Sequence, residues 1–304
     1  MSYLTEHWSF DPFLIGVIAV VAWHEIGLAR LAARSRPERT RQRRLRSIWF
    51  YAGLAVLLIA VQSPLDYWAD DYFFVHMIQH LLLMFGAPTL IVAGAPWQPM
   101  LDALPRQGGK AITRQALTAG WTRPLRAVAA FALRPWVAVT LFNVVMIFWH
   151  LPALYDLGQR NVAVHIWLVH GSYLAAGLLF WLQFVPSLPF RITWTPVSQA
   201  AALLATNVVM WALAMAMGFL SSTPWYSVYG HIPGVSLPAL ADQQIGAGIL
   251  WICGDFWAIP TMIFVMRRLM AEDGTVSAAV DRILGRGSER YNWTSRSAGS
   301  RGQR

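Results

Sequence analysis

Long apolar runs, separated by short polar segments, constrain this chain more than any other feature of its sequence. A run of about 20 residues crosses the hydrocarbon core of a bilayer as one α-helix. We identify about seven such runs by this criterion. They fall near residues 12–33, 47–65, 72–94, 136–155, 161–185, 197–219 and 241–266. The sequence therefore predicts an all-α polytopic membrane protein, a bundle of about seven transmembrane helices.

The composition agrees with this fold class. Hydrophobic residues make up 56% of the 304 residues and charged residues only 13%, which is about half the charged share of a soluble domain. The single cysteine, Cys253, lies in an apolar run, so the chain has no disulfide framework and no CxxC motif. The net charge is +9 without a basic, aromatic-bearing soluble domain. Contact with the lipid bilayer is therefore favoured, and nucleic-acid binding is not expected.

The basic residues gather in alternate connections between the runs. The segment RSRPERTRQRRLR after the first run, the connection 95–135 and the chain beyond the last run are rich in arginine. The opposite connections hold acidic residues instead: Asp66, Asp70, Asp71 and Asp156. By the positive-inside rule, the N-terminus is predicted outside and the C-terminus in the cytoplasm. Because the first residues lack a basic segment, the first run is expected to be a retained span.

The same pattern predicts the domain organisation. Residues 1–270 form a seven-helix membrane domain that includes a cytoplasmic loop over 95–135, and residues 271–304 form a basic, disordered cytoplasmic tail. The loop is expected to contain an amphipathic helix at the membrane surface.

Histidines lie inside the predicted spans, where ionisable groups are costly and are usually functional or paired. In the third span, at 100° per residue, one stripe of the helix holds His76, Met77, His80 and Met84. The two histidines stand one turn apart, so both rings can reach one point.

Further histidines follow in the fourth and fifth spans. His150 shares a helix face with Met146. His165 and His170 are five residues apart, about 140° around an α-helix, so they are not expected to serve one ion through one face. Counted along the helices, the histidines of the three spans lie in one layer, about 6–13 Å inside the outer boundary of the membrane.

Imidazole and thioether ligands together suit copper, particularly Cu(I), whereas harder ions prefer carboxylates and structural zinc prefers thiolates. A plainer interpretation is that single histidines bridge helices by hydrogen bonds and methionines fill space. The layer of five histidines favours a bound metal, with haem as the alternative cofactor. The predicted metal ligands are His76, His80, His150, His165, His170, Met77, Met84 and Asp242.

A second polar group is expected deeper in the membrane. His24 and Glu25 in the first span and Asp255 in the last lie about 18–20 Å below the outer face. We predict that His24 or Glu25 pairs with Asp255 across adjacent first and last helices, as a structural pair rather than a proton path.

Three sequence blocks resemble the CtaG family of cytochrome c oxidase assembly factors, the multi-span kind described for caa-type oxidases. They are HMIQHLLLMFGAPTLIVAGAPWQPML, FWHLPALYD at 148–156 and DQQIGAGILW at 242–251. The resemblance covers about residues 10–270, and it implies a multi-pass protein of the bacterial plasma membrane that acts with oxidase subunits. It also implies copper delivery to the copper-B centre of a haem–copper oxidase. The positions carried over are His76, His80, His150, His165, His170 and Asp242.

Other functions stay open at this point. A b-type haem protein could use His80 and His150 as axial ligands. A copper or proton-coupled transporter would need a path through the inner half of the membrane, where the polar residues are His24, Glu25, Asn143, Asn207 and Asp255. An enzyme is not expected, because no nucleophile–base pair and no complete catalytic metal motif is present.

Overall fold

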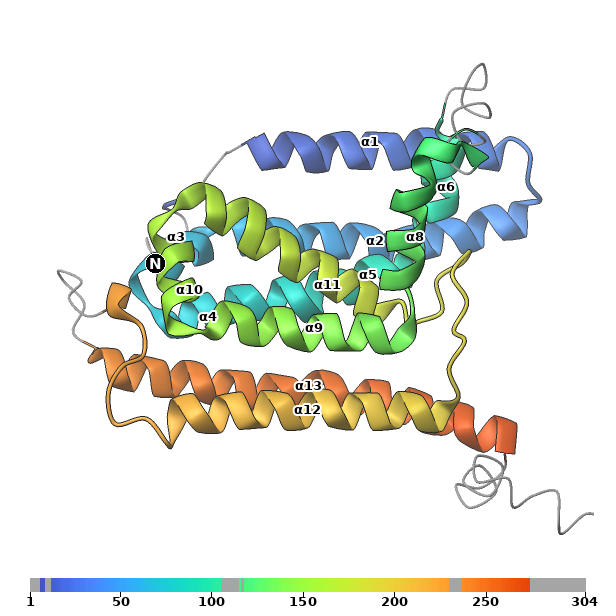
Figure 1. Cartoon of the computed structure of the whole chain (residues 1–304). Helices are drawn as coiled ribbons and strands as arrows, with labels where there is room; N and C mark the ends of the chain where they lie inside the picture. The colour runs from blue at the N-terminus through green and yellow to red at the C-terminus, as the bar shows by residue number, and fades with distance from the viewer. Residues whose placement is uncertain (1–5, 9–11, 105–114, 116–117, 230–236, 274–304) are drawn as a thin grey trace, which may run out of the picture.

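The computed structural model describes residues 6–8, 12–104, 115, 118–229 and 237–273. In these residues the regular elements are helices, without a β-strand, and most of them run side by side along one axis (Figure 1). Six helices of the described part are long and apolar enough to cross a membrane, or seven if the bent pair α8 and α9 counts as one span. The predicted all-helical membrane fold is confirmed.

The long elements form the bundle. They are α1 (Pro12–Ala32), α2 (Pro37–Gln62), the continuous run of α4 (Phe73–Leu81), η2 (Leu82–Gly86) and α5 (Ala87–Gly94), then α9 (Pro135–His150), the run of η4 (Val164–His170) and α11 (Gly171–Trp181), α12 (Pro196–Gly218) and α13 (Ala239–Asp273). Shorter helices connect them: α3 (Pro64–Asp71), α6 (Trp97–Asp102), η3 (Gly120–Thr122), α8 (Arg123–Ala132), α10 (Pro152–Arg160) and η5 (Ser227–Tyr229). Of these, η2 and η4 are π-helical.

The run over 73–94 is the centre of the bundle. It packs against α2, α11 and α13, and most of its residues are buried. Close approach depends on glycine: a Cβ at Gly94 would lie 2.5 Å from the backbone nitrogen of Phe50, and one at Gly177 would lie 2.6 Å from the carbonyl oxygen of Met84. Small residues at such crossings let helix backbones touch. The histidines of α4 therefore lie in the interior, as predicted.

Several predicted span boundaries are wrong for identifiable reasons. Helix α2 begins at Pro37 rather than residue 47, because proline suits the first turn and the arginines that follow are good helix formers. Helix α9 ends at His150, because Pro152 starts the separate helix α10. Helix α13 continues to Asp273, beyond the predicted end at residue 266.

The connection 95–135 contains α8, which meets α9 at a bend of 81° and extends away from the bundle (Figure 1). The apolar side chains of η3 and α8 at helical spacing, Trp121, Leu125, Val128 and Phe131, are all exposed. An amphipathic helix is thus present, and its position at a membrane surface stays a prediction. Residues 105–114, 116–117 and the predicted tail from 274 onward lie outside the described residues.

Helix α1 is held to the bundle mainly through α2 and α6. Trp23 Nε1 donates to the carbonyl oxygen of Met100, at 2.9 Å. Arg30 donates to three carbonyl oxygens at the end of α6, those of residues 102, 103 and 104. Free carbonyls at a helix C-terminus are natural partners of a cation. The arginine side chain thus fixes α6 beneath α1.

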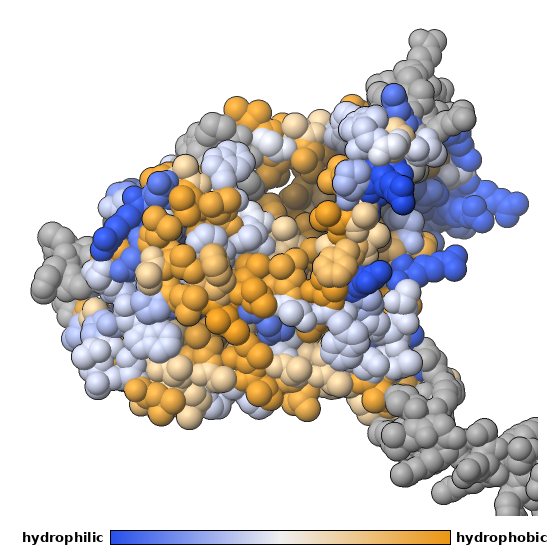
Figure 2. Space-filling view, viewed as in Figure 1, coloured by the Kyte–Doolittle hydropathy of each residue, from blue (hydrophilic) through white to orange (hydrophobic). Residues whose placement is uncertain are grey.

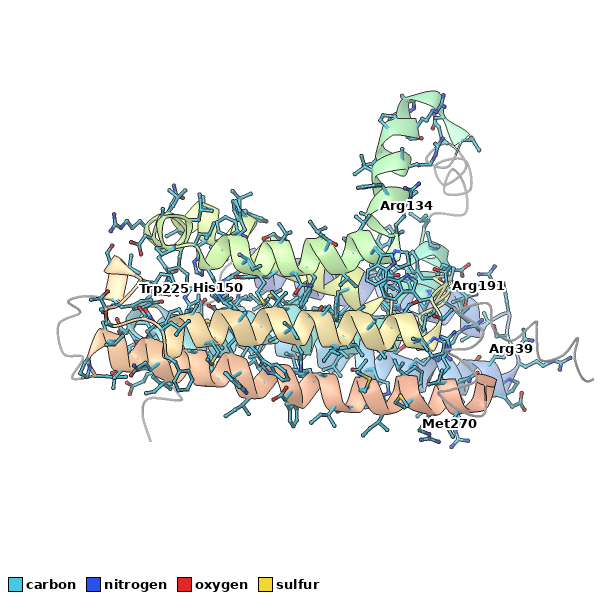
Figure 3. The ribbon with its side chains drawn as sticks, turned by 60° about the horizontal axis from the view of Figure 1, so that its bottom comes forward. Arg39, Arg134, His150, Arg191, Trp225 and Met270 are labelled. Carbon is cyan, nitrogen blue, oxygen red and sulfur yellow. The ribbon has the colours of Figure 1, made fainter. Side chains whose placement is uncertain are left out.

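The two ends of the bundle differ in chemistry. His150 and Trp225 lie toward one end, and Arg39, Arg134 and Arg191 lie at the other (Figure 3). We call the first the histidine end, which holds His76, His80, His150, His165 and His170, and the second the arginine end. Between them the visible surface is largely hydrophobic, with hydrophilic residues toward the ends (Figure 2). This distribution is the one expected of a bundle that crosses a membrane.

Candidate functional site

Four histidine rings form one cluster at the histidine end. His76 and His80, one turn apart on α4, have ring centroids 4.0 Å apart, and their Nε2 atoms are 2.6 Å apart. His165 and His170 on η4 have centroids 4.3 Å apart. The two pairs face each other, with centroid distances of 5.1 Å between His76 and His165 and 6.0 Å between His80 and His170. Two spans thus bring four imidazoles together.

The contact between His165 and His170 contradicts the expectation that they point to different sides. That expectation assumed α-helical geometry. Both histidines lie in the π-helical turn η4 (Val164–His170), in which the hydrogen bonds run from i to i+5 and residues five apart come onto one face. Such π-helical turns occur frequently at functional sites. The irregular turn is therefore what completes the cluster.

A hydrogen-bonded chain sets the proton positions in the cluster. Gln159 Nε2 donates to Nδ1 of His76, at 3.0 Å. With Nδ1 accepting, a neutral His76 carries its proton on Nε2 and donates it to Nε2 of His80. His80 then keeps its proton on Nδ1. These tautomers follow from the bonding pattern, with the amide of Gln159 oriented to donate.

Several polar atoms of the cluster remain without a partner. Nδ1 of His80, Nε2 of His170 and the hydroxyl of Tyr173 are buried and make no hydrogen bond in the structure. The ring of Tyr173 packs on that of His80, with centroids 4.5 Å apart. Leaving a buried donor or acceptor unpaired costs about 1–3 kcal/mol each. The cluster is therefore incomplete as a hydrogen-bonded structural network.

A nitrogen–sulfur pair, formed by His150 and Met77, lies next to the four histidine rings. Nδ1 of His150 lies 2.6 Å from the carbonyl oxygen of Met146, to which it donates. Its Nε2, which a neutral ring then leaves unprotonated, lies 3.4 Å from the sulfur of Met77. Neither Nε2 of His150 nor the sulfur of Met77 carries a proton, so their lone pairs face each other in the protein interior. This is a nitrogen–sulfur pair of the kind that soft metal ions bind.

The remaining predicted ligands have other contacts. The two carboxylate oxygens of Asp242 accept from the backbone N–H groups of Phe73, at 2.7 Å, and Phe74, at 2.9 Å. Asp242 thus caps the first turn of α4 and positions the histidines that follow. Met84 is buried, and its main-chain carbonyl oxygen accepts from Nε1 of Trp181 on α11. The predicted stripe assumed an unbroken α-helix, and the π-helical turn η2 changes the phase after Leu81.

The predicted pair in the inner half is not formed. His24 Nδ1 lies 2.9 Å from the hydroxyl of Tyr51, and the same hydroxyl donates to Glu25. Asp255 accepts from Asn207 instead, at 2.9 Å. Helices α1 and α13 lie on opposite sides of the bundle (Figure 1). The prediction used depth in the membrane as its criterion, and depth does not determine which helices are neighbours. His24 and Glu25 are therefore separate from Asn207 and Asp255, which does not favour one polar path for a transporter.

Sequence reasoning missed the residues that surround the rings. Gln159 and Tyr155 come from α10, and Tyr229 from η5, which are connections rather than spans. Tyr229 accepts from Gln159, at 3.0 Å, and donates to the carbonyl oxygen of Ala69. Burial raises the pKa of the Tyr155 and Tyr229 phenols, so both stay neutral donors. The only sequence signal was that Tyr155 lies within FWHLPALYD and Gln159 shortly after it, and Tyr229 had no such signal.

The rings do not yet form a ready-made ligand set. In the described part of the chain, no three His, Cys, Asp or Glu side chains are placed to hold one ion. Nε2 of His76 and Nε2 of His80 are occupied by each other. The donor types fit Cu(I), which imidazole and thioether ligands suit. Binding through this pair requires the two rings to part.

A small pocket lies beside the cluster. Its volume is about 140 Å³, and its lining includes His170, Asp66, Trp167 and Leu174. The lining comes from α2, α3, η2, η4 and α11, and Trp167 at its edge is 72% exposed. The pocket thus extends from His170 in the cluster to the lateral surface of the bundle at Trp167.

Comparison with known proteins gives one family and three relatives. The model of the cytochrome c oxidase caa3 assembly factor family (Caa3_CtaG) matches residues 22–272. The chain is 27% identical over 285 residues to uncharacterized proteins of Mycobacterium bovis and Mycobacterium tuberculosis, and 24% identical over 302 residues to one of Mycobacterium leprae. Each match covers 90% of this chain and 41% of the relative, so the chain spans about two fifths of the length of the curated relatives it matches. No solved structure matches it.

Proposed function

This chain belongs to the cytochrome c oxidase caa3 assembly factor family, and from that premise we propose that it carries copper, as Cu(I), toward the copper-B centre of a haem–copper oxidase. The family is one of assembly factors, not of catalytic enzymes. Its membership and the apolar helices fit a multi-pass protein of the bacterial plasma membrane. Copper is here the cargo of the protein, and oxidase subunits are its proposed partners.

One observation carries the proposal: at the histidine end a buried nitrogen and a buried sulfur face each other, and neither of them carries a proton. Nε2 of His150 opposes the sulfur of Met77, and Nε2 of His170 has no hydrogen bond. A structural network would satisfy such atoms, because unpaired buried groups are destabilising. A soft cation between Nε2 of His150 and the sulfur of Met77 would bind the lone pairs of both atoms.

Transfer of an ion requires that it can also leave. The donors come from different elements, α4, α9 and η4, and none of them forms a closed set around one point. A site completed only when helices shift holds its ion less tightly than a preformed one. The pocket beside His170 gives the partner a route of approach from the side of the bundle.

The arginine end is proposed to face the cytoplasm, with the N-terminus outside. The histidine end then lies in the outer half of the membrane, at the depth the resemblance implies for copper-B. The orientation can be tested with two fusions at the C-terminus, one to a fluorescent protein that is active in the cytoplasm and one to a reporter that is active in the periplasm. Activity of the periplasmic reporter would reverse the orientation and remove the depth argument.

The copper proposal is tested by metal content and Cu(I) affinity of the purified full-length chain. We expect Cu(I) to bind the wild type and to be lost in His76→Ala with His80→Ala. The matched control is His24→Ala, another buried intramembrane histidine outside the cluster, which should bind like the wild type. A Soret band lost with the same double variant would indicate haem instead. Absence of both after reconstitution would leave a scaffold that recognises the oxidase subunit itself.

A further inference from the structure

A second polar cavity lies at the arginine end and is independent of the copper site. Its volume is about 260 Å³, and it lies between α1, the first turns of α2 and the turn from α5 into α6. The charged side chains that line it are Arg39, Arg43 and Arg46. No carboxylate among the described residues lines it. The cavity is therefore strongly basic.

The spacing of the three arginines places them on one face of α2. Steps of four and three residues bring side chains above one another on a helix. Like charges at these spacings repel and destabilise the helix that carries them. Such an arrangement, directed at a cavity, is stabilised when an anion lies between the guanidinium groups.

The guanidinium groups have few partners of their own. The ion pairs between described residues are Arg34 with Asp102 and Arg160 with Asp156, so neither uses an arginine of this cavity. Arg43 donates to the hydroxyl of Ser35, at 2.7 Å, which is a neutral acceptor. The positive charges of the cavity are thus not neutralised within the described structure.

The opposite wall of the cavity is rigid. Ala95 ends α5 with φ of 46°, in the left-handed region that a side chain rarely adopts. The tight contact of Gly94 with Phe50 and the anchoring of α6 by Arg30 hold this turn in place. Strained backbone of this kind persists where the surroundings determine it, and it occurs often at ligand sites. His24, Gln42, Gln98 and Ser47 add neutral polar groups to the lining.

We propose that this cavity binds a phosphate group, as the headgroup of an anionic lipid or as a soluble phosphate compound. Guanidinium groups match phosphate oxygens through paired hydrogen bonds, and arginine is the preferred residue for that purpose. The volume suits a group of headgroup size rather than a large cofactor. The cavity opens where the basic first turns of α2 meet the arginine end of the bundle, the end expected at a membrane surface.

The test compares two ligands and two matched variants of the full-length protein in neutral detergent. A short-chain phosphatidylglycerol and glycerol 3-phosphate are each titrated by calorimetry. Arg39→Gln with Arg46→Gln should weaken binding by about tenfold or more, because hydrogen bonds to charged groups are lost. The control is Arg41→Gln with Arg44→Gln. It removes the same charge from α2, but these two arginines line a different groove. It should change affinity by less than about twofold, because neither side chain lines the cavity.

The outcomes separate the sources of the phosphate group. Binding of both ligands supports a site for the phosphate group alone, and binding of the lipid only supports a headgroup site. Equal weakening by the two double variants, or no saturable binding of either ligand, overturns the proposal. If the first variant does not fold, Gln42→Glu adds a carboxylate to the lining and should also weaken binding. Cu(I) affinity should not change in any of these variants, so this proposal can fail separately from the copper proposal.

Discussion

The histidine end and the arginine end of the bundle hold polar groups in opposite ways. At the histidine end the polar atoms are buried, and Nδ1 of His80 and Nε2 of His170 lack partners. At the arginine end Arg30 saturates the carbonyls of α6, while Arg39 and Arg46 are exposed. Buried polar atoms without partners indicate chemistry, because leaving them unpaired costs free energy. Exposed charges cost little free energy, and they indicate orientation in the membrane and attraction of anions.

Local irregularity serves each end differently. At the histidine end, π-helical turns occur in both spans of the ring cluster, and η4 brings His165 onto His170. At the arginine end, the left-handed residue Ala95 reverses the chain from α5 into α6 and forms a cavity wall. In the first case the irregular turn aims side chains inward. In the second, it turns the main chain so that the chain forms one wall of a cavity. The comparison predicts that copper binding depends on the first end alone.

The largest effect is expected from Met77→Leu. The change conserves volume and removes only the sulfur that faces His150, so stability should fall by less than about 1.5 kcal/mol. Cu(I) affinity should fall by about tenfold to a hundredfold, because a soft donor is lost. Met84→Leu, on the same run but against α11, is the control and should bind like the wild type. Equal losses in both variants would show that the sulfur facing His150 has no special role.

Gln159→Leu should have the next largest effect. Gln159 lies outside the spans, but it donates to Nδ1 of His76 and thereby sets the tautomers of the ring pair. Removal of a partner that orients a metal-binding histidine lowers metal affinity, here by about tenfold. Gln159→Glu keeps the shape but replaces the donor by an acceptor, which favours a proton on Nδ1 of His76 instead. Calorimetric Cu(I) titration of both variants would show whether orientation matters, and unchanged affinity in Gln159→Leu would contradict the role assigned to the chain of bonds.

Asp242→Ala is expected to act on the fold first and on copper second. Its two oxygens satisfy the N–H groups of Phe73 and Phe74 at the start of α4. Loss of a helix cap of this kind costs about 1–2 kcal/mol. The unfolding temperature in detergent should drop, and Asp242→Asn, which keeps one acceptor, should drop less. If Asp242→Ala lost copper without any change in unfolding temperature, the residue would be a ligand rather than a cap.

Much of this arrangement could be predicted from the sequence. Apolar run length predicts the bundle, and α-helical spacing correctly places His76 beside His80. What failed depended on local geometry and on which helices are neighbours. No pattern marks the π-helical turn that joins His165 to His170, and depth alone paired His24 or Glu25 with Asp255. Residues in connections, such as Gln159, carry no periodic signal at all, although they complete the environment of the rings.

The smallest effect is expected from breaking the ion pair of Arg34 and Asp102 at the arginine end. Arg34 is half exposed, so water and salt screen the pair, and such pairs contribute about 0–1 kcal/mol. Arg34→Gln should therefore shift the unfolding temperature little and leave Cu(I) affinity unchanged, because the pair is remote from the rings. The matched change at the other end is Gln159→Leu, which also removes one polar partner. If Arg34→Gln lowered copper affinity as much as Gln159→Leu did, the ends would be coupled, and the histidine end could not be treated as a site by itself.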